Sequence, residues 1–162
     1  MKKLLLGAAA FAIVFASCKK DDTTNNNNPA PARTNAITIG DDTYTYGSGL
    51  SAFQILKNTI VVSGIKGDDG AGVVYTFSGN DLPVAGIYRV IAEDSVDNLT
   101  ATQVSFRANK NTDYYESTGA GAVDLKVTVS NGKYTVVMPT APAKSSDNSG
   151  KSTTVSVDVT QK

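Results

Sequence analysis

The sequence predicts a single all-β domain over residues 36–162, an antiparallel β-sandwich or flattened barrel of about 8–10 strands. Three observations predict this class. The ordered runs are rich in Thr, Val, Tyr and Ile, which favour strands. Apolar and polar residues alternate with a period of two, and Gly, Asn, Asp and Pro interrupt the runs. The segment of 127 residues is also long enough to bury one core without disulfides.

The alternation places the strands in order along the chain. We expect strands over residues 36–39, 43–46, 51–56, 59–65, 72–78, 86–92, 101–108, 114–118 and 153–159. The runs 59–65 and 72–78 should form a hairpin across residues 67–72. In the last run Val155, Val157 and Val159 alternate with polar residues, so one face should be buried. No segment of the domain shows helical periodicity.

The strongest local signal is the Asn131-Gly132 dipeptide between two alternating runs. This dipeptide favours a type I′ turn, because both of its residues tolerate left-handed backbone torsions. A two-residue loop pairs Val129 with Tyr134, Val127 with Val136 and Leu125 with Met138, and places these six side chains on one face. The polar residues between them should face water: Asp124, Lys126, Thr128, Lys133 and Thr135.

The first 17 residues have the pattern of a cleaved signal peptide. Lys2 and Lys3 precede an uncharged run of 12 residues over 4–15, and two small residues follow it. A run of this length is shorter than the roughly 20 apolar residues that a membrane span needs. Cys18, the single cysteine of the chain, comes directly afterwards, so no intramolecular disulfide is expected.

Cys18 and the residues before it resemble the lipobox of bacterial lipoproteins. The resemblance implies that the Cys18 thiol receives a diacylglyceryl group and that Cys18 becomes the new N-terminus, which would anchor the protein to a membrane through palmitate-type chains. The cluster Lys19, Lys20, Asp21 and Asp22 is similar to the export signal of Bacteroidetes-type lipoproteins. That likeness implies display on the outer face of the outer membrane, with the periplasmic face as the alternative.

Residues 18–35 should form a disordered tether between the lipid and the domain. The segment is dominated by Asn, Thr, Pro and Ala and offers little apolar area to offset the entropy of ordering. After removal of residues 1–17 the chain has 13 basic and 15 acidic side chains, a net charge of −2. A slightly acidic chain without basic clusters argues against nucleic acid as a partner.

The composition excludes most catalytic and metal sites. The chain has no histidine, which removes the commonest general base and most zinc sites, and its one thiol is assigned to lipid. The sequence defines no separation between Glu93 and Glu116 from which a glycosidase geometry could be inferred. Asp68 and Asp69 lack the ligand spacing of an EF-hand loop. We therefore expect no catalytic residue, no metal and no cofactor.

Ser95 and Thr23 are candidate glycosylation sites. Both lie in short motifs, Asp94-Ser95-Val96 and Asp22-Thr23-Thr24, that are similar to the O-glycosylation tripeptide of exported proteins in such bacteria.

Four tyrosines are the candidate ligand-binding residues. Tyr44 and Tyr46 lie two residues apart and should share a face of a strand, whereas Tyr114 and Tyr115 should point in opposite directions. Exposed tyrosine beside Asn and Asp suits sugar rings or peptide, while tyrosines in the core would only fill space.

The pattern around Pro83-Val84-Ala85-Gly86-Ile87-Tyr88 resembles small β-rich surface lipoproteins of Bacteroidetes. The hypothesis is a surface-tethered, non-catalytic domain that binds a glycan or an outer-membrane protein partner. The alternatives are a hydrolase that uses carboxylates alone and a calycin-like carrier of a small apolar ligand.

Overall fold

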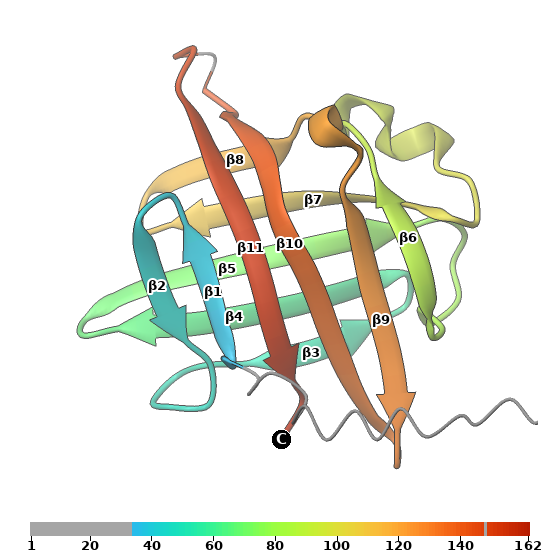
Figure 1. Cartoon of the computed structure of the whole chain (residues 1–162), viewed down its shortest axis with the longest axis horizontal. Coiled ribbons are helices and arrows are strands. Elements are labelled where there is room, and N and C mark those ends of the chain that lie inside the picture. The colour runs from blue at the N-terminus through green and yellow to red at the C-terminus, as the bar shows by residue number, and fades with distance from the viewer. Residues whose placement is uncertain (1–33, 148) are drawn as a thin grey trace, which may run out of the picture. The chain divides into compact units, whose positions relative to one another are not determined.

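The computed structural model describes residues 34–147 and 149–162 (Figure 1). They form eleven strands and two short 3₁₀ helices, so the predicted all-β class is confirmed. The strands are β1 (Ala36–Ile39), β2 (Asp42–Thr45), β3 (Phe53–Leu56), β4 (Thr59–Lys66), β5 (Asp69–Phe77), β6 (Gly86–Val90), β7 (Gln103–Lys110), β8 (Asp113–Ser117), β9 (Asp124–Ser130), β10 (Lys133–Ser145) and β11 (Ser152–Thr160). The helices are η1 (Glu93–Asn98) and η2 (Ala120–Ala122).

All eleven strands belong to one sheet whose hydrogen bonds close into a ring. The order is β11-β1-β2-β4-β5-β7-β6-β9-β10, and β10 pairs again with β11. β8 joins β7 to β10, and β3 pairs with β4 outside the ring. Every described pairing is antiparallel except that of β6 with β7. Figure 1 shows the ring flattened into two layers, with β6, β9, β10 and β11 running across β4, β5 and β7. This arrangement is consistent with the predicted sandwich or flattened barrel.

The core fills the space between the two layers. Alternate residues of each strand point inward, as the period-two pattern predicts. Val155, Val157 and Val159 of β11 are all buried, which confirms the predicted face. The largest fully buried side chains are Tyr44, Tyr75, Phe106, Ile37, Ile39, Ile60, Leu125 and Met138.

Two backbone features close the ring at its corners. β2 meets β4 only through the pair Thr45 and Ile65, and next to it a Cβ on Gly64 would lie 3.0 Å from the Tyr44 carbonyl oxygen. Glycine at position 64 therefore allows this close approach, and a larger residue there would push the backbone of β2 away by a few tenths of an ångström. On the other side, the register of β10 shifts between Met138 and Ala141. This bulge lets one strand pair with β9 in its first half and with β8 in its second.

The predicted hairpin at Asn131-Gly132 is confirmed. The two residues have φ of 52° and 74°, as a type I′ turn requires, and Val129 pairs with Tyr134. The pairing of Val127 with Val136 is confirmed as well, but the ladder ends one step later, at Val137 and Lys126, so the predicted pair of Leu125 with Met138 is not formed.

Thr135 is buried, contrary to prediction, because β11 covers it and its hydroxyl lies 3.0 Å from that of Thr160.

Two local predictions were wrong. β4 and β5 form the predicted hairpin, but its turn has only two residues, Gly67 and Asp68, because Lys66 already pairs with Asp69. The positive φ of Gly67 allows this tight turn. In addition, the strand expected over residues 86–92 ends at Val90, and the 3₁₀ helix η1 follows. A 3₁₀ helix of six residues has too few turns to leave a helical pattern in the sequence.

Candidate functional site

The residues predicted to carry the lipid and the export signal lie outside the described residues. They are Cys18, Lys19, Lys20, Asp21 and Asp22, together with the candidate glycosylation site Thr23. Their roles stay predictions. The other candidate glycosylation site, Ser95, lies exposed on η1.

The four candidate tyrosines separate into core and surface. Tyr44 and Tyr46 share a face as predicted, but that face is the core, where they are only 1% and 7% exposed. They are therefore not part of a binding surface. Tyr114 and Tyr115 point in opposite directions, because the Tyr114 side chain is 61% exposed whereas Tyr115 packs against the core. Of these four rings, only Tyr114 presents a broad surface to a ligand.

The strand register places Tyr114 at the end of a polar row on the outer face of the sheet. Ser63 of β4 pairs with Gly72 of β5, Gly72 pairs with Asn109 of β7, and Asn109 pairs with Tyr114 of β8. Directly opposed residues in antiparallel strands share a face, so this row crosses four strands. The residues beside it in sequence, Val62, Val73 and Ala108, are buried on the inner face.

A shallow groove of about 410 Å³ lies along this row. Gly70 exposes its backbone there, because it has no side chain, whereas Gly72 is buried beneath the Asn109 amide. The Asn109 amide lies across β5, with its Oδ1 atom 2.8 Å from the position that a Cβ of residue 72 would take. Asn111 and Asp68 line the groove beside it. The groove thus combines a flat floor with groups that donate and accept hydrogen bonds.

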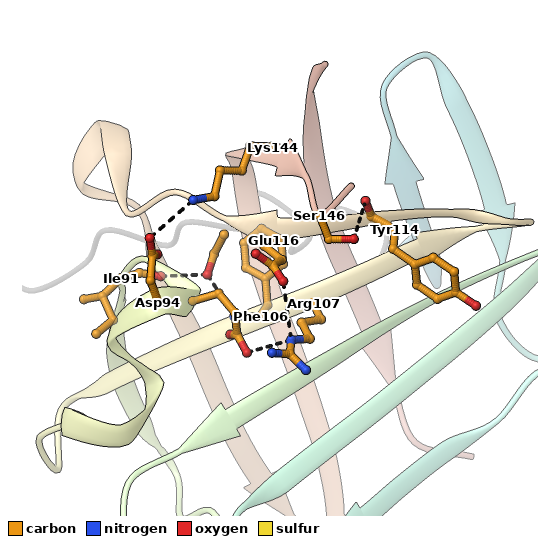
Figure 2. Close-up of polar contacts among 10 residues, drawn as sticks. Ile91, Asp94, Phe106, Arg107, Tyr114, Glu116, Lys144 and Ser146 are labelled. Carbon is orange, nitrogen blue, oxygen red and sulfur yellow. Dashed lines mark hydrogen bonds and ion pairs between the residues drawn. The ribbon is translucent and has the colours of Figure 1, made fainter. Parts of the chain in front are cut away.

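A second hollow of about 220 Å³ lies on the other side of Asn109. It is lined by Arg107, Tyr114, Glu116 and Ser146, among others. The backbone amide of Ser146 donates to the Tyr114 carbonyl oxygen at 3.0 Å, which holds the β10–β11 loop against β8. Figure 2 shows Tyr114 beside Ser146, and the ring of Tyr114 points away from Arg107.

Arg107 lies between two glutamates, and the sequence does not indicate that these two residues are close in space. Its Nε lies 2.8 Å from Oε1 of Glu93 and 3.9 Å from Oε1 of Glu116. The Glu93 side chain is only 6% exposed, and its other oxygen, Oε2, has no hydrogen-bond partner among the described residues. The guanidinium occupies the space between the carboxylates, where a glycosidic oxygen would have to lie. The arrangement is therefore an ion cluster rather than an open acid–base pair.

Hydrogen bonds fix η1, and with it Glu93, against the sheet (Figure 2). The Phe106 backbone amide donates to the Ser117 hydroxyl at 3.1 Å, and that hydroxyl donates to the Ile91 carbonyl at 2.7 Å. The Nζ atom of Lys144, in β10, lies 3.3 Å from the Oδ2 atom of Asp94, in η1. The ion cluster is thus held by residues from η1, β7, β8 and β10.

A different charge cluster covers one end of the core. Asp42 of β2 forms ion pairs with Lys66 of β4 and Lys110 of β7. The hydrogen bonds from Lys110 and Lys66 lower the pKa of Asp42 to about 2. Each of these three residues lies at the end of its strand, on the side that faces the core. The cluster therefore links β2, β4 and β7 where the core meets solvent.

The sequence contains part of the signal for the groove. Gly70 and Gly72 lie two residues apart and share a face of β5, while Asn109 lies on β7 and Asn111 follows in the turn, with a φ of 52°. What the sequence does not contain is the non-local pairing of β5 with β7, which brings these glycines and asparagines together.

Among the described residues, no group of three or more acidic side chains is arranged to hold a metal ion. No helix in residues 34–147 or 149–162 has the length and apolarity to cross a membrane. Comparisons with family models, curated proteins and solved structures found no match to this chain.

Proposed function

We propose that this protein is an outer-membrane lipoprotein, anchored through Cys18, whose β domain binds a neutral carbohydrate without catalysing its cleavage. The lipobox and the cluster Lys19–Asp22 support the anchor and display on the cell exterior. The groove over Gly70 and Gly72, together with the exposed ring of Tyr114, supports the ligand class. Periplasmic display remains the alternative location, and an outer-membrane protein the alternative partner.

The observation that carries this proposal is the composition of the groove. A sugar ring presents a flat face of C–H groups and an edge of hydroxyls. Gly70 gives the flat face room, and the amides of Asn109 and Asn111 can both donate to and accept from hydroxyls. Tyr114 adds an apolar ring with a polar tip. Among the described residues that line the groove, Asp68 is the one with a charge, which disfavours phosphate and other anions.

Two other activities fit the geometry less well. A hydrolase would need free carboxylates, but Arg107 lies between Glu93 and Glu116. A carrier of a small apolar ligand would need a hollow interior, but the space between the layers is filled by large side chains such as Tyr75 and Phe106. Binding on the outer face therefore suits the domain best.

Calorimetric titration with neutral oligosaccharides of glucose, galactose, mannose and xylose tests the ligand class. The mature chain carrying Cys18→Ser should bind at least one of them, and Tyr114→Ala should weaken that binding about tenfold, as the loss of one stacking contact predicts. Ile87→Ala is the control, because Ile87 is equally exposed on another strand. Absence of binding to every oligosaccharide would contradict a carbohydrate ligand and favour a protein partner.

Metabolic labelling with a palmitate analogue tests the anchor. The wild-type chain should be labelled and Cys18→Ser should not, because the thiol is the acceptor of the lipid. Equal labelling of both would remove the anchor from this proposal. Protease treatment of intact cells then separates exterior display, in which the domain is digested, from periplasmic display, in which it is protected.

A further inference from the structure

Most of the exposed large apolar side chains of the described domain gather at one end. We call this set the apolar rim: Leu56, Leu82, Val84, Ile87 and Val129, which are between 42% and 67% exposed. Beside it lies a recess of about 190 Å³ whose walls include Phe77, Tyr88 and Ala101. Exposed apolar side chains that gather in one region of the surface indicate contact with another surface.

Hydrogen bonds bring the parts of the rim together. The Asn58 side chain, two residues after Leu56, donates to the Phe77 carbonyl at 2.9 Å, and Phe77 lines the recess with Leu82 and Val84. On the other side, the Tyr134 hydroxyl donates to the carbonyl of Pro83 at 3.0 Å.

Tyr134 is the strand partner of Val129, so the β9–β10 hairpin lies beside the loop that carries Leu82 and Val84. The rim is therefore built from three segments of the chain that hydrogen bonds hold near one another.

Exposed lysines accompany the rim. Lys57 follows Leu56, Lys126 pairs with Ile87 across β6 and β9, and Lys133 begins β10 after the turn that follows Val129. None of these lysines forms an ion pair among the described residues. One acidic residue, Asp81, lines the recess, so the net charge of these four side chains is positive. Apolar side chains flanked by lysine match the chemistry of an anionic lipid surface.

The described chain also begins next to the rim. The Thr160 backbone amide donates to the Asn35 side chain at 3.2 Å, and the Gln161 backbone amide donates to the Tyr134 carbonyl at 2.8 Å. Residue 35 is thus one strand away from Tyr134. Residues 18–33, which precede the domain, can span at most about 55 Å when fully extended. A lipid at Cys18 would keep the rim close to the membrane, where even weak contacts become effective.

We infer that the apolar rim rests on the anionic lipid surface in which Cys18 is anchored. This inference rests on the proposed lipid anchor. The apolar side chains enter the headgroup region, and Lys57, Lys126 and Lys133 lie near the anionic groups. Figure 1 shows the β9–β10 hairpin and the C-terminus at the opposite end of the domain from β8, which carries Tyr114. Docking by the rim therefore turns Tyr114 away from the membrane.

Fluorescence quenching in vesicles tests the orientation. The lipidated mature protein is reconstituted in vesicles of phosphatidylethanolamine and phosphatidylglycerol, and an environment-sensitive dye is attached at Val84→Cys or at Tyr114→Cys. With Cys18 acylated, the introduced thiol is the only free one. Spin-labelled lipid should quench the dye at position 84 several-fold more than the dye at position 114. Equal quenching at both positions would overturn the inference.

A matched pair of variants tests the rim itself. Leu82→Ser combined with Ile87→Ser should reduce the quenching at position 84 toward that at position 114. Leu50→Ser is the control, because Leu50 is the most exposed apolar side chain but lines the groove instead. Unchanged quenching in the double variant would contradict docking by the rim. Palmitate labelling of the same preparations reports on the anchor separately, so failure of the anchor and failure of docking are distinguishable.

Discussion

The amide of Asn109 occupies the space that a side chain on Gly72 would fill. The Oδ1 atom lies 2.8 Å from the position of the absent Cβ, and the two residues are paired across β5 and β7. The missing side chain of one strand is thus replaced by the polar group of its neighbour, which shapes the groove without opening a hole in it.

Gly72→Ala should change the groove while leaving the fold intact. The new methyl group meets only the end of a flexible side chain, so the free energy of unfolding should change by less than about 1 kcal/mol. The Asn109 amide must move, however, and carbohydrate affinity should fall. Chemical denaturation and calorimetric titration measure the two effects. An unchanged affinity would show that the position of the Asn109 amide is irrelevant to binding.

Gly132→Ala and Gly70→Ala should differ in stability although neither new methyl group meets another atom within 4 Å. Gly132 has a φ of 74° in the type I′ turn, so alanine there should cost about 1–2 kcal/mol. Gly70 has an ordinary strand conformation, where alanine should be neutral or should stabilise by about 0.5–1 kcal/mol. Urea denaturation of the two variants compares them directly. Equal stabilities would contradict a conformational role for Gly132.

Arg107→Leu should destabilise the domain by about 1.5–3 kcal/mol, because it removes the charged hydrogen-bond partner of the buried Glu93. Glu116→Gln should have a smaller effect, since Glu116 is more exposed and lies 3.9 Å from the guanidinium. Adding Glu93→Gln to Arg107→Leu should restore part of the loss, because the unpaired buried charge is then absent. Denaturation of the single and double variants completes this cycle, and strictly additive effects would argue against coupling.

Acid should weaken the domain partly through Asp42. The hydrogen bonds from Lys110 and Lys66 lower its pKa in the folded state to about 2, below an ordinary value near 3.8. The stabilisation by the ionised carboxylate is therefore complete above pH ~4 and is lost as the pH falls toward 2. Asp42→Asn should flatten the fall in unfolding free energy over this range.

Asp147 contributes over the same range and provides the comparison. Hydrogen bonds from Ser145 and Ser149 lower the pKa of Asp147 to about 2. Asp147→Asn should thus remove a separate part of the acid dependence, and the double variant with Asp42→Asn should lose both. Urea denaturation between pH 2 and 6 checks these slopes. An unchanged slope in Asp42→Asn would contradict the role of the lysines.

Tyr75→Phe should leave the domain as stable as before or stabilise it by about 1–3 kcal/mol. The Tyr75 hydroxyl is fully buried and has no hydrogen-bond partner among the described residues, so its loss removes a desolvation cost. Burial also raises the pKa of Tyr75 well above its usual range. Thermal denaturation of the variant measures the effect. A clear loss of stability would show that the hydroxyl has a partner, such as buried water.

The fold could be predicted from the sequence because strand formation here is local. Alternation in β11 and the Asn131-Gly132 turn each lie within a few residues, and both are confirmed. The sequence left open whether Tyr44 and Tyr46 lie in the core or on the surface, for a definite reason. A period of two shows which residues share a face, but not which face is buried. That choice depends on strands far away in the sequence.

The candidate site depends on the same non-local pairing. The contact of Arg107 with Glu93 requires η1 to fold over β7, and the groove requires β5 to pair with β7. The parallel pairing of β6 with β7 and the bulge in β10 have no local signature either.

The unpaired outer edge of β3 sets a limit on how copies of this domain can assemble. Among the described strands, β3 is the one with a partner on a single side, whereas each other strand pairs with at least two neighbours, β2 with β4 through a single residue pair. Growth of a fibre by strand addition requires two free edges on each molecule, one to receive and one to extend. A molecule with one edge can join its sheet to only one other, in a symmetric pair that leaves no edge open. Even where copies are crowded together, edge-to-edge association would therefore stop at two.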